Sequence, residues 1–282
     1  MTIHNSITFV VAIPANRREL LQKNLLASPC FRGSHPHQII VQEDYSSATK
    51  AYNDAINRSE NDLIVFLHSD IILPEPWISD LQRALHCLAT DDPEWGVIGC
   101  YGETLNDNGR GYIYSSGLGI VGKPFERPEP IQTLDEVVLV MKKSSGLRFD
   151  ESLLYFHMYG TDICMTAVEA GRKNYAISAF CIHNTQPGLI LGDDFYECYW
   201  HIRKKWKSRL PIQTTCIRIT RYNHGMYRRK LGEMYIRYIN PKEFGGSRVA
   251  DVPRLLSEVD DMLKRKAESV RVSTGVLRET RT

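Results

Sequence analysis

The stretch Asp62–Trp77 reads Asp-Leu-Ile-Val-Phe-Leu-His-Ser-Asp-Ile-Ile-Leu-Pro-Glu-Pro-Trp. Its Leu63–Leu67 run is short, unbroken and rich in β-forming side chains, which predicts a strand buried on both faces. His68 and Asp70 follow at the carboxyl end of that strand, and a helical pattern begins near Trp77, after two prolines. Ligands of open α/β sheets bind just outside the carboxyl ends of strands, so Asp70 is either a ligand-binding carboxylate or the cap of the following turn.

The residues before this stretch alternate between strand and helix patterns. The elements that we expect there are a strand over Ile7–Ile13, a helix over Arg18–Leu26, a strand over Gln38–Gln42 and a helix from Ser46 or Ser47 to Ile56. Strand–helix–strand alternation at this spacing predicts an α/β protein with parallel strands. Polar residues then gather at one sheet edge, at Pro14–Asn16, Glu43–Asp44 and His68–Asp70.

The middle of the chain is less regular. We expect strands over Val97–Gly102 and Thr133–Met141. Gly117–Gly122 matches the dinucleotide string G-x-G-x-x-G, but that fingerprint requires a helix directly afterwards, and Lys123–Pro130 contains three prolines. We therefore exclude a Rossmann cofactor site and expect a mobile loop that covers the bound ligands.

Composition predicts a soluble cytoplasmic protein. The chain has 282 residues, a formal net charge of +2, 43% hydrophobic and 24% charged residues. No global charge favours nucleic acid, no apolar run is long enough to cross a bilayer, and the start of the chain lacks a signal-peptide pattern. The seven cysteines form no C-x-x-C pair, which predicts reduced thiols.

Seven short motifs follow one another in an order that is typical of one enzyme family. They are Ala-Ile-Pro-Ala-Asn-Arg (12–17), Val-Gln-Glu-Asp-Tyr-Ser (41–46), Asn53, Phe-Leu-His-Ser-Asp (66–70), Leu-Arg-Phe-Asp-Glu (147–151), Tyr-Gly-Thr-Asp-Ile-Cys (159–164) and Ile182-His183. Together they resemble the family 2 glycosyltransferases, in the subgroup whose acidic motif reads His-x-Asp instead of Asp-x-Asp. The resemblance spans residues 7 to 183.

The resemblance implies a GT-A nucleotide-diphospho-sugar transferase fold, with a mostly parallel central sheet flanked by helices. We expect a catalytic domain over residues 1–190, with a nucleotide-sugar-binding half (1–100) and an acceptor-side half (101–190). A helical, basic extension follows over residues 191–282. The implied activity is transfer of a sugar from a UDP-, GDP- or dTDP-linked donor to a saccharide or lipid-linked acceptor, with inversion, in surface polysaccharide synthesis.

The resemblance also implies the residues of the site. Asp70 and His183 would hold Mn²⁺ or Mg²⁺, which stabilises the charge of the leaving diphosphate; a half-buried histidine at a strand end is the alternative for His183. His68 replaces the family's first Asp and adds no negative charge. The nucleotide-binding residues implied are Pro14, Asn16, Arg17, Glu43, Asp44, Asn53, His68 and Asp70. Those facing the sugar or acceptor are Tyr101, Gly102, Asp135, Glu136 and Tyr159.

The catalytic base is the point at which this sequence departs from the family. An inverting transfer needs a carboxylate that accepts the proton of the acceptor hydroxyl. The family's Glu-Asp pair falls on Tyr159 and Gly160, so the usual position of the base carries no carboxylate. Asp162 is our candidate, with an N-cap role for its helix as the alternative, and His157 is a second candidate.

The C-terminal third is basic and aromatic. Arg and Lys residues recur from Arg203 to Arg237 against a single acidic residue, Glu233. This pattern fits an anionic membrane surface or a lipid-diphosphate acceptor, and a solvated basic face is the plainer alternative. Val252–Ala267 has heptad-like apolar spacing, which predicts a closing or dimerising helix.

Two other functions compete with the transferase. A GT-A-fold protein that binds nucleotide or carbohydrate without catalysis is consistent with His68 and with Gly160. A sugar nucleotidyltransferase would carry a Gly-rich phosphate loop after the first strand, and residues 14–18 contain no glycine.

Overall fold

The computed structural model describes residues 6–32, 37–106, 109–185, 190–239 and 248–279. Its largest sheet has the strand order β2-β1-β3-β11-β5-β12-β9. These strands are β1 (Thr8–Ile13), β2 (Gln38–Glu43), β3 (Leu63–Leu67), β5 (Ile98–Gly99), β9 (Glu129–Ile131), β11 (Val138–Lys142) and β12 (Asn174–Ala176). β1 lies between β2 and β3 and is parallel to both, whereas β11 runs antiparallel to its neighbours β3 and β5. The half of the sheet that precedes residue 70 is therefore parallel, and the later half is mixed.

Helices cover both faces of this sheet because its strands are apolar on both sides. On β3, Ile64 and Phe66 pack into one core, while Leu63, Val65 and Leu67 pack into the other. The first core includes side chains of α2 (Ala48–Arg58), α4 (Tyr159–Glu169) and α5 (Asp193–Lys205), and the second those of α1 (Arg18–Lys23) and α3 (Trp77–Asp91). The predicted α/β class, with a sheet flanked by helices, is confirmed.

A second sheet lies beside the first and includes the strand that ends at His183. Its order is β10-β6-β7-β13-β4, and β8 pairs with β7. The strands are β4 (Ile71–Ile72), β6 (Tyr101–Glu103), β7 (Gly109–Ser115), β8 (Gly119–Gly122), β10 (Thr133–Leu134) and β13 (Cys181–His183). The G-x-G-x-x-G string forms the turn and second strand of the β7–β8 hairpin, so the exclusion of a Rossmann helix at this point is confirmed.

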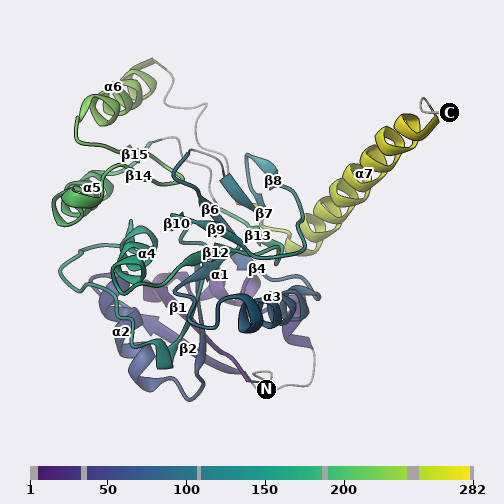
Figure 1. Cartoon of the computed structure of the whole chain (residues 1–282), viewed down its shortest axis with the longest axis horizontal. Coiled ribbons are helices and arrows are strands. Elements are labelled where there is room, and N and C mark those ends of the chain that lie inside the picture. The colour runs from purple at the N-terminus through teal and green to yellow at the C-terminus, as the bar shows by residue number, and fades with distance from the viewer. Residues whose placement is uncertain (1–5, 33–36, 107–108, 186–189, 240–247, 280–282) are drawn as a thin grey trace.

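The C-terminal third consists of helices and one hairpin (Figure 1). α5 is followed by the hairpin β14 (Ile212–Gln213) and β15 (Arg218–Ile219), then by α6 (His224–Ile239) and α7 (Val252–Glu279). Val252, Leu255 and Val259 anchor the start of α7 against the second sheet, and the rest of α7 projects away from the body (Figure 1). The domain boundary that we predict at residue 190 follows directly on residues 186–189, which lie outside the described residues, and it stays a prediction.

Most element boundaries agree with the sequence expectations. β3 spans the expected residues, α3 begins at Trp77, and the Ser47 side chain accepts a hydrogen bond from Lys50 N at the start of α2. The predicted strand over Thr133–Met141 is broken into β10 and β11, because Asp135 and Glu136 form a connection between the two sheets. Short 3₁₀ turns complete the chain, at Ala15–Arg17, Pro29–Arg32, Lys143–Ser145 and Lys207–Arg209.

All seven cysteines are free thiols, as expected. Within the described ranges, none of the helices is both long enough and apolar enough to span a bilayer.

Candidate active site

Strand pairing explains why Asp70 and His183 meet although they are far apart in sequence. β13 runs antiparallel to β4, in a register that sets His183 opposite Ile71. The backbone N–H of Asn184 continues the ladder by donating to the carbonyl of Asp70 at 2.9 Å. As a result, His183 Nε2 lies 3.4 Å from Asp70 Oδ1. The predicted convergence of these two side chains is therefore observed.

His68 completes a cluster with these two residues. Its ring centroid lies 5.6 Å from that of His183. One potential ligand atom from each of His68, Asp70 and His183 lies within 4.8 Å of the other two. Ligand atoms that each lie about 2.1 Å from one divalent ion are roughly 3 to 4.3 Å from one another. Small side-chain rotations would therefore bring all three residues to a single ion.

A hydrogen-bond chain orients the His68 ring. His68 Nε2 lies 3.0 Å from Tyr159 Oη, and this hydroxyl donates to the carbonyl of Glu136 at 3.3 Å. Since the single hydroxyl hydrogen of Tyr159 is used there, we assign the hydrogen of His68 to Nε2, which leaves a lone pair on Nδ1. Burial and then repulsion from His183 lower the pKa of His68, so its imidazole is neutral. A neutral ring held by a second residue is the form that ligates metals.

Asp70 is an ionised carboxylate in a mostly buried position. Burial opposes its ionisation, but the hydrogen bond and charge of His183, with the hydrogen bond from Arg248, outweigh burial and lower its pKa. Arg248 donates from Nη2 and Nε to Asp70 Oδ2, at 3.0 and 3.3 Å. Oδ1 of Asp70 therefore faces the imidazole of His183, and Oδ2 faces the guanidinium of Arg248.

Arg248 belongs to a short strap, residues 248–251, that leads into α7. Asn184, the residue after His183, holds this strap. Its amide donates to the carbonyl of Val249 and accepts from Val249 N–H, both at 2.9 Å. Sequence reasoning missed Arg248, because its only signal is an Arg that lies far outside the motifs.

The strap forms one wall of a cavity of about 330 Å³. Asn16, Arg17 and Arg248 line it together with residues of α1. Asn16 and Arg17 are two of the predicted nucleotide-binding residues, and Arg248 connects this cavity to Asp70. The cavity has cationic side chains on two of its walls, which suits an anionic ligand.

The ends of β1 and β2 are fixed to each other. The Asp44 side chain accepts a hydrogen bond from Ala15 N at 2.9 Å, directly after Pro14. Glu43 forms an ion pair with Arg18. Pro14, Glu43 and Asp44 thus lie at the predicted sheet edge, where Asp44 shapes the turn that carries Asn16 and Arg17.

The Asn53 side chain binds the 149–151 segment, and the implied nucleotide contact stays a prediction. Its Nδ2 donates to the carbonyl of Phe149 at 2.9 Å and to Glu151 Oε1 at 3.0 Å, and its Oδ1 accepts from Phe149 N at 3.0 Å. Because both donors and the acceptor are used by the 149–151 segment, we assign Asn53 to holding that segment.

Glu136 fills the space in front of Gly160. Its Oε1 accepts a hydrogen bond from Gly160 N at 3.1 Å, and a Cβ built on Gly160 would lie 2.8 Å from Glu136 Cγ. Burial raises the pKa of Glu136 to about 8. A side chain at position 160, where the resemblance expects the base, would therefore collide with the side chain of Glu136, whose carboxyl group binds the backbone N–H there.

The other predicted sugar-facing residues lie around Glu136. Asp135 N donates to the carbonyl of Tyr101 at 2.9 Å, and a Cβ on Gly102 would lie 2.4 Å from the carbonyl of Thr133. Gly102 is therefore required for close packing of β6 against β10. The charge of Asp135 acts on the pKa of His68, which puts this carboxylate within electrostatic range of the cluster.

Asp162, our candidate base, is enclosed by residues of α5 and its C-terminal end. Its side chain is 2% exposed, Oδ1 accepts from Trp206 Nε1 at 2.7 Å, and Oδ2 accepts from Lys205 Nζ at 2.9 Å. α4 begins at Tyr159 and follows Met158, so Asp162 is in the first turn and is not the N-cap of the alternative interpretation. Both oxygens are used to attach α5 to α4, which gives Asp162 a structural role.

His157, the second candidate, precedes α4 and lies at the surface. Its Nε2 is 3.3 Å from Asp194 Oδ2, at the start of α5, and its side chain is 37% exposed. His157 therefore borders the site and remains available to an acceptor.

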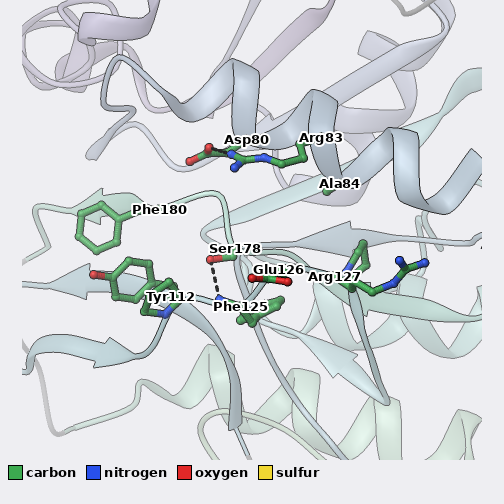
Figure 2. A pocket seen from close by; sticks show the side chains of 11 residues that line it. Asp80, Arg83, Ala84, Tyr112, Phe125, Glu126, Arg127, Ser178 and Phe180 are labelled. Atoms are coloured by element: carbon green, nitrogen blue, oxygen red, sulfur yellow. Dashed lines mark hydrogen bonds and ion pairs between the residues drawn. The ribbon is translucent and has the colours of Figure 1, made fainter. Parts of the chain in front are cut away.

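A larger cavity, of about 740 Å³, lies between α3 and the segments that carry Phe125 and Phe180 (Figure 2). Asp80, Arg83 and Ala84 of α3 form one side, and the loop after β8 forms another. Phe125 N in this loop donates to Ser178 Oγ at 3.2 Å. The loop that we expected over the donor or acceptor thus encloses a cavity whose lining contains none of the three cluster residues.

The cluster fits a divalent cation that accepts both imidazole and carboxylate. Mn²⁺ tolerates this mixture, whereas Mg²⁺ takes almost only oxygen ligands. Two histidines and one aspartate therefore favour Mn²⁺ over Mg²⁺ among the two predicted ions.

Comparisons with known proteins give distant likenesses. No protein-family model matches the chain. Over 165 residues, 57% of this chain and 66% of the relative, the chain is 26% identical to the "ATP synthase subunits region ORF 6" protein of Fuscovulum blasticum. The match thus spans slightly less than two thirds of that relative.

Solved structures with a similar arrangement include TarS from S. aureus, at a TM-score of 0.46 and 14% identity, covering 71% of this chain and 39% of that one. They also include the mannosyltransferase PcManGT from Pyrobaculum calidifontis, solved in complex with GDP-Man and Mn²⁺. Here the TM-score is 0.41 and the identity 13%, over 70% of this chain and 60% of that one. At this distance the likeness says nothing of this chain's substrate, metal or acceptor.

Proposed function

We propose that this protein is a metal-dependent glycosyltransferase of the GT-A type, which uses a nucleotide-diphosphate sugar as donor. The observation that carries the proposal is the convergence of His68, Asp70 and His183 at the carboxyl edge of a parallel β2-β1-β3 unit. All three residues come from motifs that resemble those of family 2 glycosyltransferases, and they meet where open α/β sheets bind ligands.

Asp70 and His183, with Nδ1 of His68, would hold the ion. A divalent cation supplies charge stabilisation for the diphosphate that leaves with the nucleotide. Tyr159 fixes the His68 ring through its hydroxyl group. The donor set supports Mn²⁺, and the single carboxylate predicts weaker ion affinity in the absence of nucleotide.

Arg248 and Arg17 would bind the donor phosphates from the cavity beside the cluster. Arg guanidinium groups pair with phosphate oxygens in a bidentate manner. A diphosphate that enters the cavity would therefore draw Arg248 from Asp70 and leave that carboxylate to the ion. Asp44, Glu43, Pro14 and Asn16 would shape the part of the pocket that receives the nucleoside.

Glu136 would act as the base in place of a residue at position 160. Its carboxylate lies against Gly160, where the resemblance expects the base, and it is bonded to the amino end of α4. An ionised Glu136 accepts the proton of the acceptor hydroxyl as the oxygen attacks the anomeric carbon, which inverts the configuration. Asp135 and His157 would contact the sugar or the acceptor from either side.

We further propose a UDP-, GDP- or dTDP-linked donor and a saccharide or lipid-linked acceptor, in the synthesis of surface polysaccharide on the cytoplasmic face of a membrane. The basic C-terminal third supports an acceptor that carries phosphate.

Thermal unfolding tests the proposal directly. The midpoint is measured with UDP, GDP or dTDP, each with and without Mn²⁺, for the native chain, Asp70→Asn and Asp260→Asn. One nucleotide is expected to raise the midpoint only together with Mn²⁺ in the native chain and in Asp260→Asn, whose carboxylate is exposed on α7. Asp70→Asn should lose this response.

Equal stabilisation of all three proteins, or stabilisation without Mn²⁺, would remove the metal site from the proposal. Metal-dependent binding without hydrolysis of any donor in a screen of nucleotide sugars would favour the catalytically inactive binding protein instead.

A further inference from the structure

α6 has an apolar stripe on the side that faces solvent. Tyr227, Leu231, Met234 and Tyr238 are spaced by four, three and four residues, which places them on one face of a helix with about 3.6 residues per turn. Their exposed fractions are 54%, 65%, 60% and 90%. This arrangement is the reverse of an ordinary surface helix, whose apolar face packs inward.

Contacts on the opposite face hold α6 in this orientation. Glu233 is buried, and its carboxylate accepts from Tyr196 Oη of α5 at 2.8 Å and from Arg229 Nε at 3.1 Å. Arg229 also donates to the carbonyl of Cys216, in the turn between β14 and β15, at 2.9 Å. Met226 is buried on the same side. This face of α6 is thus fixed to the body, and the apolar stripe on the opposite face is exposed to solvent.

Cationic side chains flank the stripe. By helical position, Arg237 lies on one side of it and Arg228 lies on the other. Lys230 lies on the side of Arg237 and forms an ion pair with Asp193 at 3.8 Å. The segment from residue 203 to 238 contains eleven Lys and Arg residues and one acidic residue, the buried Glu233. Figure 1 shows α6 at one end of the molecule, beyond α5 and the β14–β15 hairpin.

We infer that α6 is an interfacial helix that docks the protein on an anionic lipid surface. A stripe of Leu, Met and Tyr between cations is the pattern of helices that lie in the headgroup region, with the apolar side inserted and the cations paired with lipid phosphates. A second copy of the chain fits this face less well, because a two-fold interface would bring the cationic flanks of both copies together.

Flotation of the full chain with lipid vesicles tests the inference. The vesicles are made of phosphatidylcholine alone or of phosphatidylcholine with phosphatidylglycerol, and contain no donor or acceptor. The native chain is expected to float with the anionic vesicles and not with the neutral ones, and binding should fall as salt is raised. Because no substrate is present, the result does not depend on the proposed enzymatic function.

Variants distinguish the contribution of the apolar stripe to vesicle binding from that of the cationic side chains. Leu231→Ser with Met234→Ser should weaken binding to anionic vesicles by about tenfold or more, and Arg228→Gln with Arg237→Gln should weaken it and reduce its salt dependence. Leu118→Ser with Leu154→Ser removes two apolar side chains that are exposed elsewhere, at 76% and 50%, and should leave binding unchanged. Thermal midpoints of the three variants should equal that of the native chain, since all of these side chains are exposed.

Absence of binding to anionic vesicles, or equal binding by the native chain and the stripe variant, would overturn the inference. So would a dimer in size-exclusion chromatography that the stripe substitutions dissociate, or displacement of the vesicles by RNA at the same ionic strength.

Discussion

Replacement of Asp162 by Asn should destabilise the protein and leave the chemistry of each folded molecule largely intact. In the native structure this buried carboxylate accepts from Trp206 Nε1 and Lys205 Nζ. An Asn side chain has the same shape but only one acceptor atom. If its oxygen remains on Trp206, its amide hydrogens face the ammonium group of Lys205, and a charge-assisted hydrogen bond is lost.

The expected magnitude follows from these contacts. Lys205 is 28% exposed and keeps Asp150 as a partner at 2.8 Å, so it is not left unpaired. The free energy of unfolding should therefore fall by the contribution of one charge-assisted hydrogen bond, about 2 kcal/mol. This is less than the roughly 3–5 kcal/mol that is lost when one member of a fully buried ion pair is removed. In a domain of this size, that corresponds to a fall in the thermal midpoint of roughly 4–8 °C.

Two further variants calibrate the measurement. Asp162→Ala also leaves Trp206 Nε1 buried without an acceptor and should cost about 4 kcal/mol. Asp150→Asn removes the other, 27% exposed partner of Lys205 and should cost about 1 kcal/mol or less. Urea unfolding gives these free energies, and donor turnover is measured well below each midpoint.

The structural role would be refuted by the opposite pattern. An Asp162→Asn variant with a native free energy of unfolding and a hundredfold or greater loss of turnover would show that Asp162 is the base.

The other predictions concern the proposed site. Glu136→Gln should abolish turnover but keep nucleotide binding. Between the ordinary pKa of 4.5 and the raised pKa of about 8, the folded chain holds a proton on Glu136 that the unfolded chain has lost, so the free energy of unfolding should fall as pH rises, by up to about 1.4 kcal/mol per pH unit. Urea titrations of the variant should lack this slope. Native turnover should accordingly rise with pH through about 8. In calorimetry, Arg248→Gln should weaken binding of the nucleoside diphosphate by roughly 10- to 100-fold and tighten binding of Mn²⁺ alone, and the control Arg254→Gln should change neither affinity. A loss of affinity for both the diphosphate and Mn²⁺ would contradict the exchange of Arg248 between Asp70 and phosphate. Tyr159→Phe should lower Mn²⁺ affinity about 10- to 100-fold by freeing the His68 ring, and unchanged affinity would show that the hydroxyl does not position it.

The sequence was informative wherever a short stretch decides its own structure. The Leu63–Leu67 run predicts a buried strand because every side chain is apolar, and Ser47 predicts a helix start because its hydroxyl caps the first turn. Asp70 and His183 were predicted to meet because each ends a motif of a known order, and the β4–β13 register explains how they do.

The sequence was uninformative wherever a role depends on which distant segment supplies the partner. Asp162 reads as a free acid at the start of a helix, and only the packing of α5 shows that Lys205 and Trp206 enclose it. Arg248 lies 178 positions from Asp70 in the sequence, in a strap that the amide of Asn184 holds in place. Neither contact has a spacing rule that a single sequence can express.

Gly160 shows how a missing residue can be explained by a residue elsewhere. Taken alone, the absence of a carboxylate at this position suggests that catalysis has been lost. In the structure, the side chain of Glu136 lies in the space that a side chain at 160 would need, and it bonds to the backbone N–H of Gly160. A Gly160→Ala substitution would therefore press a methyl group against Glu136 Cγ, whereas a glycine lets the carboxylate reach the amino end of α4. The two positions form one unit, in which the glycine makes room and the glutamate supplies the carboxyl group.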